Sequence, residues 1–367
     1  MKIALVHDWL VNLSGAERVL FELHKMFPEA PIYTLFENKK FTKQYLPDAE
    51  IRPSFLQKIP GVVRNYKYFF FLMPTAIESF DLSNFDVVIS SSAIFSKGLV
   101  LKPKTKHICY CYSPTRQIWD LHSEFHTPHS TLYNLSQHFL RIWDRQASDR
   151  VDEFVAISEH VRERIQKYYR RDAEVIYPPI TLNNEQKTMN KKMLIAHRSL
   201  SPGYYLIVSR LYKHKNIHIA IEAFAKLNLP LVIIGDGPEY KNLRRYGAMA
   251  PHIKLLGFIP DEELAYYYQN CRAFIMPQEE DFGLTPIEVM SYGKPVLALR
   301  KGGAIETIIE GKTGEFFDDP IPEALADGVR RLNENYLSYD SEFIKSHVQK
   351  FSVDNFREKF SKLVYNN

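Results

Sequence analysis

The sequence predicts an α/β protein with two halves, each built around its own parallel sheet. Short continuous apolar runs, such as Ile3–Val6 and Asp86–Ser90, are typical of strands buried on both faces of a sheet. Segments with helical apolar spacing follow most of these runs, which is the pattern of βαβ units. The alternation stops at the polar stretch Thr181–Gly203 and then restarts, and 367 residues exceed one ordinary core.

The first half begins with a strand, a glycine-containing loop and a helix. Ile3–Val6 leads through Gly15 into a segment whose apolar residues recur at helical spacing as far as Met26. The loop lacks the GxGxxG spacing of dinucleotide-binding folds. Further strands are expected at Pro31–Phe36, Asp86–Ser90, Lys106–Tyr112, Val151–Ile157 and Glu174–Ile176, and helices at Ser130–Asp149 and from Ser158 to Tyr169.

The second half repeats the alternation from Tyr204 onward. Strands are expected at Tyr204–Ser209, Leu231–Ile234, Ile253–Leu256, Ala273–Met276, Pro295–Leu299 and Gly314–Phe317, and helices at His218–Leu227, Glu239–Tyr246, Asp261–Asn270 and Ala304–Glu310. The remainder reads as helical, and we expect Val353–Val364 to pack back on the first half. These assignments divide the chain into domains at residues 1–180 and 204–350, a linker region at 181–203 and a final helical segment at 351–367.

Composition excludes several classes of protein. An apolar content of 45% and a charged content of 25% describe a soluble globular protein, and a net charge of +4 does not imply a nucleic-acid partner. Three cysteines provide no disulfide framework, which favours the cytoplasm. We expect no signal peptide, because Met1 and Lys2 lead directly into a short apolar strand, and no run approaches the ~18 apolar residues of a membrane span. No His/Asp/Glu spacing recurs, so we expect no metal cofactor.

The stretch Met276–Gly293, MPQEEDFGLTPIEVMSYG, is the most informative of the chain. It follows a strand, and Thr285 can cap a helix that begins at Pro286. Backbone N–H groups in a first helical turn lack partners and bind anions. A phosphate is therefore expected in front of Gly283, Leu284 and Thr285.

Two carboxylates, Glu280 and Glu288, flank this expected phosphate position. Carboxylates accept hydrogen bonds from hydroxyls, so the pair suits the two sugars of a nucleotide sugar. Two alternatives stay open: Glu288 closes a capping box with Thr285, or Glu280 is a solvated loop acid.

Two further segments follow strands of the second half. Arg210 and Lys215, in SRLYKHKNI, come at the carboxyl end of a strand, where open α/β sheets bind ligands, and two cations there can hold a diphosphate. Gly235 and Gly237, in GDGP, leave room for a planar base to approach the backbone. The alternatives are a solvated basic loop and a plain turn.

The stretch Arg52–Pro74 combines four basic residues with six aromatics and no acid. Arg64 and Lys67 lie beside Phe69 and Phe70 in a continuous apolar run. One interpretation is a core helix with a basic rim. The other is a surface that meets anionic lipid with its basic residues and lipid headgroups with its aromatics.

Four of these motifs together resemble the family 4 retaining glycosyltransferases of the GT-B fold. The Glu-x7-Glu pattern is similar to EDFGLTPIE, the Arg and Lys pair to SRLYKHK, and GDGPE and GGAIETI also look like family elements. Longer segments of the sequence, which include HDWL and CYCYSPTRQIWD, look most like bacterial mannosyltransferases of O-antigen and exopolysaccharide assembly. The resemblance covers nearly the whole chain and implies two Rossmann-like domains facing a cleft.

The resemblance also implies roles for the residues. Glu280 would contact the donor hexose and Glu288 the ribose, while Arg210 and Lys215 would neutralise the leaving diphosphate. The donor site would further include Gly15, Gly235, Gly237, Gly283, Leu284 and Thr285. One departure is Tyr112, in CYCYSP, where many members of the family carry a histidine that can become cationic.

These implications define an expected activity. We expect a metal-independent retaining hexosyltransferase that moves mannose from GDP-mannose to a lipid-linked or oligosaccharide acceptor in lipopolysaccharide or exopolysaccharide synthesis. Arg64, Lys67, Phe69 and Phe70 would serve acceptor binding and peripheral attachment to an anionic membrane, with no nucleic-acid partner. The alternatives are a sugar-nucleotide epimerase of the same fold and a non-catalytic nucleotide-sugar-binding scaffold.

Overall fold

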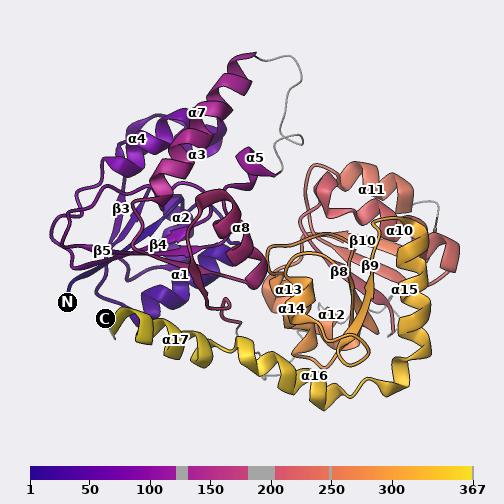
Figure 1. Ribbon diagram of the computed structural model, residues 1–367. Coiled ribbons are helices and arrows are strands. Elements are labelled where there is room, and N and C mark those ends of the chain that lie inside the picture. The colour runs from indigo at the N-terminus through magenta and orange to yellow at the C-terminus, as the bar shows by residue number, and fades with distance from the viewer. Residues whose placement is uncertain (121–130, 181–202, 248–249, 366–367) are drawn as a thin grey trace. The chain divides into compact units, whose positions relative to one another are not determined.

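The computed structural model (Figure 1) describes residues 1–120, 131–180, 203–247 and 250–365. The chain divides into two compact units, each described by itself below. The first unit is Met1–Pro179 together with the segment from Val353 onward, and the second is Ile180–Ser352. Most of the expected linker region at 181–203 lies outside the described residues.

A seven-stranded, fully parallel sheet forms the centre of the first unit, in the order β3-β2-β1-β4-β5-β6-β7. The strands are β1 (Ile3–His7), β2 (Ile32–Thr34), β3 (Ile51–Pro53), β4 (Val87–Ser92), β5 (Lys106–Cys111), β6 (Glu153–Ala156) and β7 (Ala173–Val175). The strand order reverses between β1 and β4. Ligands of open α/β sheets bind at the carboxyl ends of the strands beside such a reversal.

Helices cover this sheet and connect its strands. They are α1 (Gly15–Met26), α2 (Lys39–Tyr45), η1 (Phe55–Lys58), α3 (Val62–Asn65), η2 (Tyr66–Leu72), α4 (Met73–Glu78), α5 (Arg116–Trp119), α7 (Thr131–Ser148), α8 (Glu159–Tyr169) and α17 (Val353–Tyr365). The stretch Arg52–Pro74 is thus not one helix. Gly61, with a φ of 76°, separates η1 from α3, and the apolar run itself forms the 3-10 helix η2.

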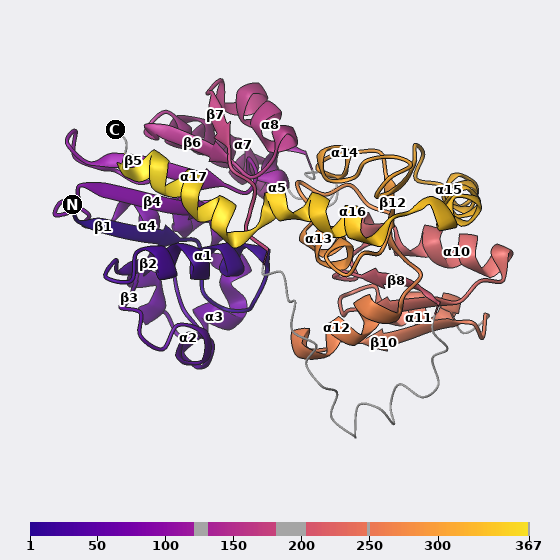
Figure 2. The same cartoon turned by 90° about the horizontal axis from the view of Figure 1, so that it is seen from below.

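The expected return of the C-terminal helix is confirmed. Figure 2 shows α17 lying across the first unit beside β5 and α1. The ring of Tyr110 on β5 packs edge-on against Phe356 and Phe360 of α17, and all three side chains are buried. Arg357 adds an ion pair with Glu22 of α1, at 2.7 Å.

The second unit has a six-stranded parallel sheet in the order β10-β9-β8-β11-β12-β13. Its strands are β8 (Tyr205–Val208), β9 (Leu231–Ile234), β10 (Ile253–Gly257), β11 (Ala273–Met276), β12 (Val296–Leu299) and β13 (Gly314–Phe317). Its helices are η3 (Lys213–Lys215), α10 (Ile217–Leu227), α11 (Tyr240–Gly247), α12 (Asp261–Asn270), α13 (Leu284–Met290), α14 (Ala304–Thr307), α15 (Pro322–Glu334), η4 (Tyr336–Ser338), α16 (Ser341–His347) and η5 (Val348–Phe351). Here the order reverses between β8 and β11.

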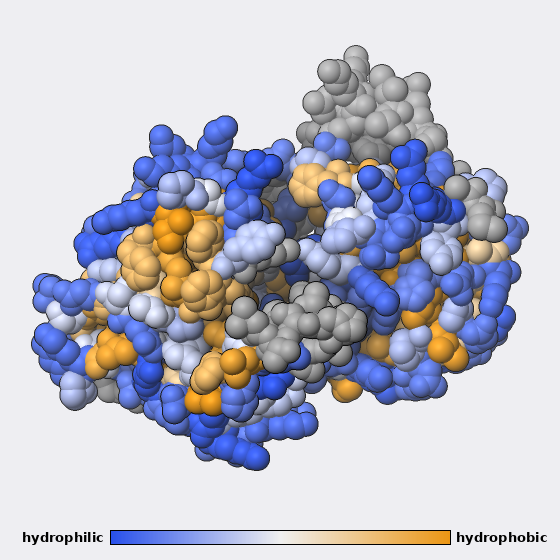
Figure 3. All heavy atoms as spheres, turned by 90° about the horizontal axis from the view of Figure 1, so that it is seen from above, coloured by the Kyte–Doolittle hydropathy of each residue, from blue (hydrophilic) through white to orange (hydrophobic). Residues whose placement is uncertain are grey.

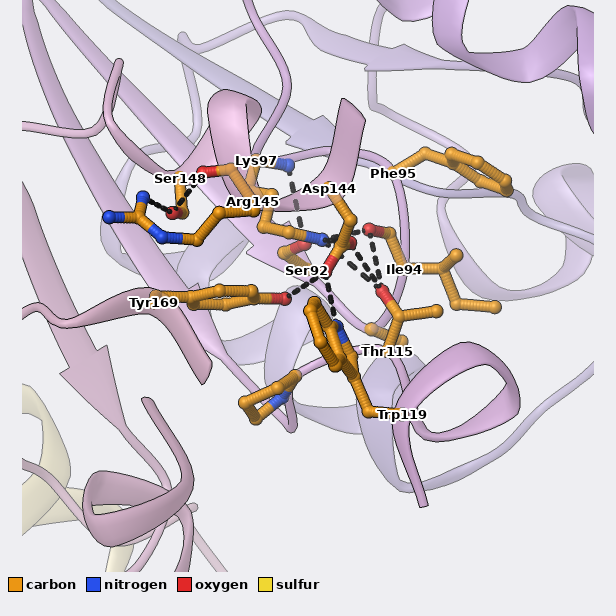
Figure 4. A network of polar contacts seen from close by, with 12 residues as sticks. Ser92, Ile94, Phe95, Lys97, Thr115, Trp119, Asp144, Arg145, Ser148 and Tyr169 are labelled. Atoms are coloured by element: carbon orange, nitrogen blue, oxygen red, sulfur yellow. Dashed lines mark hydrogen bonds and ion pairs between the residues drawn. The ribbon is translucent and has the colours of Figure 1, made fainter. Parts of the chain in front are cut away.

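A buried ion pair connects α7 to the rest of the first unit (Figure 4). Nζ of Lys97 lies 2.6 Å from Oδ1 of Asp144, and both side chains are at most 2% exposed. Asp144 also accepts hydrogen bonds from Thr115, Trp119 and Tyr169, at 2.7–2.8 Å. Burial alone would lower the pKa of Lys97, but the Asp144 carboxylate raises it above its ordinary value. Lys97 therefore stays charged, and the pair joins α5, α7 and α8 to the loop after β4.

The core of the first sheet also contains a neutral histidine, which gives a pH-dependent prediction. His107 is fully buried, with Nε2 2.8 Å from Oγ of Ser90 and Nδ1 without a hydrogen-bond partner. Burial lowers its pKa from 6.5 to about 4, although the Asp152 carboxylate opposes the shift. The unfolded chain binds this proton first, so stability is lost as the pH falls from about 6.5 to about 4.

We expect His107→Gln to reduce the loss of unfolding free energy in acid. At pH 5, which is 1.5 units below the ordinary pKa of 6.5, a neutral His107 costs the wild type about 2 kcal/mol of unfolding free energy, at about 1.36 kcal/mol per unit. Urea unfolding of both proteins at pH 7 and pH 5 measures this difference. Titrating carboxylates contribute equally to both proteins, so their effect cancels in the comparison. An equal loss of unfolding free energy in the variant would contradict a neutral His107.

Candidate active site

The sheet of the second unit brings two sequence-predicted segments together. Arg210 follows β8 and Glu280 follows β11, and these two strands flank the reversal of strand order. Asn216, with a φ of 53°, ends η3 and donates from Nδ2 to the carbonyl of Pro277, at 3.2 Å. The loop after β8 is thereby fastened to the loop after β11.

A cation and a carboxylate meet between these loops. Nζ of Lys215 donates to Oε1 of Glu280 at 2.6 Å, although Lys215 is only 5% exposed. Nε2 of Gln278 donates to the same oxygen at 3.0 Å. The structure therefore brings Lys215 and Glu280 together, as a directly bonded pair.

Gln278 is a site residue that motif reasoning missed. Its side chain is 5% exposed, and its contact with Glu280 fixes the amide orientation because only the NH₂ end can donate to a carboxylate. Oε1 of Gln278 is left buried without a hydrogen-bond partner. An uncharged amide in an acidic loop directly after a buried strand was the available signal.

Arg210 differs from Lys215 in its surroundings. Its side chain is exposed, and its guanidinium lies 5.8 Å from the ring centre of Tyr212. It is thus available to an incoming anion without the loss of a buried contact. Lys215 by contrast can turn to an anion only by sharing or leaving Glu280.

The helix that follows Glu280 begins earlier than the sequence indicated. Helix α13 starts at Leu284, and its N-cap is Gly283, whose φ of 87° lies in the left-handed region that favours glycine. Thr285 is therefore not the cap, and the predicted cap and capping box are wrong. Thr285→Ala loses no cap hydrogen bond.

Glu288 has a different partner from the one a capping box would give it. Its Oε2 accepts a hydrogen bond from the hydroxyl of Tyr268 on α12, at 3.0 Å, and its side chain is half-buried. Glu288 thus lies half-buried on the helix that follows Glu280. The position of its carboxylate is fixed by Tyr268 and not by a capping hydrogen bond at the start of α13.

Gly235 and Gly237 follow β9 and pack against the loop that carries Arg210. A Cβ at Gly235 would lie 1.8 Å from the Ser209 carbonyl oxygen, and one at Gly237 would lie 2.5 Å from that of Leu211. Their φ values of 141° and 158° also suit glycine. The structure thus gives these glycines a packing role beside Arg210, where the sequence suggested room for a base.

The first unit carries a polar cluster at its own reversal of strand order. His7 ends β1, Ser91 lies in β4, and Tyr112 follows β5. Nδ1 of His7 lies 3.0 Å from Oγ of Ser91, and Nε2 lies 3.4 Å from Oε1 of Glu17. The hydroxyl of Tyr112 reaches both Ser91, at 2.8 Å, and the carbonyl of Ala16, at 2.9 Å.

Gly15 is the first residue of α1 and lies within this cluster. Ser14, the N-cap of α1, hydrogen-bonds to Oε2 of Glu17. The neighbouring Asp8 is 2% exposed and accepts four backbone N–H groups, at 2.7–2.8 Å, from the loop after β4. Motif reasoning selected Gly15 and Tyr112 but missed His7 and Glu17 as a pair.

The basic, aromatic stretch is only partly exposed. Phe69 and Phe70 are half-buried against the core of the first unit, while Tyr68 and Phe71 are 78% and 64% exposed. Arg64 is exposed, and the side chain of Lys67 lies outside the described residues. Packing against the core therefore holds for the two predicted phenylalanines and fails for their exposed neighbours Tyr68 and Phe71.

Helix α7 adds an apolar surface that the sequence did not lead us to expect. Its buried side carries Gln137 and Asp144, whereas Leu135, Phe139 and Ile142 are 43–61% exposed. Figure 3 shows hydrophobic side chains gathered on the face of the first unit that carries α3, α4 and α7.

The described residues contain neither a metal-binding cluster nor a helix that could span a membrane. No cluster of three or more His, Cys, Asp or Glu residues suitable for a metal ion occurs in the part of the chain that the structure describes. Among the described helices, none combines the length and apolar character needed to cross a bilayer.

Comparison with known families decides the class of protein. A model described as glycosyl transferases group 1 matches residues 195–349, and one described as glycosyltransferase family 4 matches residues 13–184. The chain belongs to the family 4 glycosyltransferases. The family resemblance inferred from the motifs is thus confirmed.

Relatives of this glycosyltransferase include both characterised and uncharacterised proteins. It is 27% identical over 217 residues to an uncharacterised glycosyltransferase of Methanocaldococcus jannaschii, in a match that covers 58% of this chain and 59% of the relative. It is 25% identical over 424 residues to the alpha-1,3/1,6-mannosyltransferase ALG2 of Candida glabrata. That match covers 98% of this chain and 92% of the relative.

Solved structures support the fold of this glycosyltransferase. HepE of Anabaena, in complex with UDP, superposes with a TM-score of 0.73 and 18% identity over 100% of both chains. That likeness, with the two parallel sheets, confirms the GT-B fold.

Proposed function

We propose that this glycosyltransferase is a retaining mannosyltransferase that uses GDP-mannose and an oligosaccharide or lipid-linked acceptor in surface polysaccharide synthesis. The observation that carries the proposal is the contact between Lys215 and Glu280 at the reversal of strand order in the second unit. A buried cation able to bind a diphosphate and a carboxylate able to accept from sugar hydroxyls thus lie together, and a nucleotide sugar needs both kinds of group. The mannosyltransferase ALG2 supports the choice of sugar, and the UDP complex of HepE supports a nucleotide-sugar donor.

The chemistry follows from the charge of the leaving group. Departure of the nucleoside diphosphate builds negative charge on the phosphate oxygens, and Arg210 and Lys215 are proposed to stabilise it as permanent cations. The backbone N–H groups of Gly283 and Leu284 are proposed to assist, with Thr285 beside them. Glu280 then accepts hydrogen bonds from hexose hydroxyls once Lys215 turns to the phosphate.

The stereochemical proposal is attack on the face from which the leaving group departs. The departing phosphate takes the proton of the acceptor hydroxyl, and the new glycosidic bond forms as the bond to the phosphate breaks. In this mechanism Glu280 orients the sugar and does not act as a nucleophile. Gly15 is proposed to border the donor phosphates, and Gly235 and Gly237 to shape the base region through the Arg210 loop.

A thermal-shift screen followed by a transfer assay tests this function. GDP-mannose should raise the melting temperature more than UDP-glucose, because a ligand of the native state stabilises it. Transfer in the presence of EDTA should continue, since Arg210 and Lys215 supply the positive charge, and NMR should show the donor's α-configuration in the product. A preference for UDP-glucose would overturn the proposed donor, and an inverted product would overturn retention.

Glu288 offers a test of ribose recognition. Glu288→Gln keeps an acceptor for the Tyr268 hydroxyl, so the melting temperature should change by only a degree or two, or a few tenths of a kcal/mol. Loss of the charge should weaken GDP binding by about 5- to 30-fold, or ~1–2 kcal/mol, in calorimetric titration. Tyr268→Phe is the matched control, because it removes the protein partner and keeps the carboxylate. Unchanged GDP affinity in Glu288→Gln would assign that residue a structural role.

The membrane partner is proposed from the exposed face of the first unit. Arg64 is exposed near Tyr68 and Phe71, and each basic residue near an anionic surface contributes ~1 kcal/mol. Sedimentation with anionic liposomes should show binding that weakens with salt and falls in Arg64→Glu. Lys226→Glu, at an exposed site on α10 of the second unit, is the control. Equal sedimentation with neutral liposomes would contradict an electrostatic membrane contact.

A further inference from the structure

His7, Ser91, Tyr112 and the Ala16 carbonyl form a chain of hydrogen bonds beside Gly15. The Ala16 carbonyl determines which atom donates in each of these bonds. The carbonyl of Ala16 can only accept, so the Tyr112 hydroxyl donates to it, at 2.9 Å. The Tyr112 oxygen is then the acceptor in its 2.8 Å contact with Ser91, whose hydroxyl must donate. Both hydroxyl protons of the chain are therefore used.

The same logic determines one proton of His7. The Ser91 hydroxyl oxygen has given its proton to Tyr112, so Nδ1 of His7, 3.0 Å away, must donate to it. Nδ1 also lies 3.2 Å from the Ser91 carbonyl, which can only accept. Nδ1 of His7 thus carries a hydrogen in either contact.

The second ring nitrogen then faces an acceptor. Nε2 of His7 lies 3.4 Å from Oε1 of Glu17, and both side chains are at most 5% exposed. A neutral ring with its hydrogen on Nδ1 has a bare Nε2, which would oppose the carboxylate as acceptor against acceptor. One more proton is needed between the two side chains.

The surroundings favour the ring as the holder of that proton. An imidazole ring binds a proton more strongly than a carboxylate by about two pKa units in water, and the Ser14 hydroxyl donates to Oε2 of Glu17, which favours the ionised carboxylate. Asp8 follows His7 in the chain, and Tyr112 is connected to His7 through Ser91. The Asp8 carboxylate is occupied by four backbone N–H groups of the loop after β4.

We propose that Glu17 holds His7 as an imidazolium, and that this buried charge pair positions the start of α1, Ser14–Ala16, for glycosyl transfer. The N-cap Ser14 is bonded to Glu17, and Ala16 is bonded to Tyr112. Both bonds belong to the chain that His7 connects. The positioning role rests on the proposed function, since Gly15 lies at this helix start, whereas the charge state of His7 does not.

Loss of the His7 proton has a defined consequence. The bare Nε2 would repel the Glu17 carboxylate, and the first turn of α1, which carries Gly15 and Ala16, would lose its anchor. The turnover number kcat should therefore fall on the alkaline side of the pH profile. In Glu17→Gln the amide N–H can donate to a neutral ring, while the amide oxygen still accepts from Ser14. That variant should have a neutral His7 and no alkaline fall from this source.

Nitrogen NMR of the full-length protein labelled at histidine tests the charge state without any substrate. The His7 signals are assigned by their disappearance in His7→Asn. At pH 7 the wild type should show both His7 ring nitrogens protonated, and Glu17→Gln should show one. A singly protonated ring in the wild type would overturn the proposal, and so would a doubly protonated ring in Glu17→Gln.

The pH profile of kcat then tests the positioning role. Wild type should lose at least ~10-fold in kcat on the alkaline side, and Glu17→Gln should not. Identical profiles in the two proteins would overturn the role in transfer even where the NMR result stands. Absence of transfer with every nucleotide sugar would instead contradict the proposed function, and the NMR result would still decide the charge of His7.

Discussion

The double replacement Arg210→Ala with Lys215→Met is expected to lower kcat by at least ~100-fold. The two cations are proposed to stabilise charge that appears as the diphosphate leaves, and removal of one such preorganised donor costs ~2.7–4 kcal/mol in comparable sites. Because that charge is larger in the transition state than in the bound donor, kcat should fall more than KM rises. Steady-state kinetics with GDP-mannose and circular dichroism of the variant measure the two effects.

Lys213→Ala is the matched control for this experiment. Lys213 lies in η3 two residues before Lys215, but its side chain is exposed. Its loss should leave kcat within about twofold, since exposed charges are screened by solvent. Near-normal turnover in the double variant, or an equal loss in the control, would refute the assignment of the diphosphate to Arg210 and Lys215.

Lys97→Met is expected to lower the free energy of unfolding by about 3–5 kcal/mol. It removes one partner of a fully buried ion pair and leaves the Asp144 carboxylate in the core without its cation. The hydrogen bonds that Asp144 accepts from Thr115, Trp119 and Tyr169 do not replace that charge. Chemical denaturation at pH 7 measures the change.

The control for Lys97→Met is Lys226→Met. Lys226 forms an ion pair with Glu323 at the same 2.6 Å, but both side chains are more than 60% exposed. Exposed pairs contribute ~0–1 kcal/mol, so this variant should be nearly silent. Similar losses in the two variants would show that burial does not govern the stability contribution of the Lys97 pair.

Elements with strong local signals could be predicted from the sequence. Continuous apolar runs identified most of the strands, and Leu231–Ile234 and Ala273–Met276 agree with the structure residue for residue. Short edge elements were harder, because Ile51–Pro53 has only three residues and no alternation. The start of α13 was misjudged because Thr285 is a good cap in isolation, whereas the left-handed Gly283 is the N-cap and the helix begins two residues earlier.

The contacts of the candidate site were beyond sequence patterns. Lys215 and Glu280 are 65 residues apart, and their pairing depends on which strands become neighbours in the sheet. The exposed apolar side of α7 was equally hidden, since helical spacing marks an apolar stripe but not the direction it faces. The orientation of α7 is set by Asp144, which must be buried because it forms the ion pair with Lys97.

The two-part make-up of the first unit has a consequence for the order of events during synthesis. Its sheet comes from residues made first, but the rings that cover Tyr110 belong to Phe356 and Phe360. The second unit, by contrast, is one continuous segment of the chain. On the ribosome the later unit can therefore complete its core before the earlier one. In the nascent first unit, the ring of Tyr110 therefore lacks its two aromatic neighbours until translation has passed residue 360.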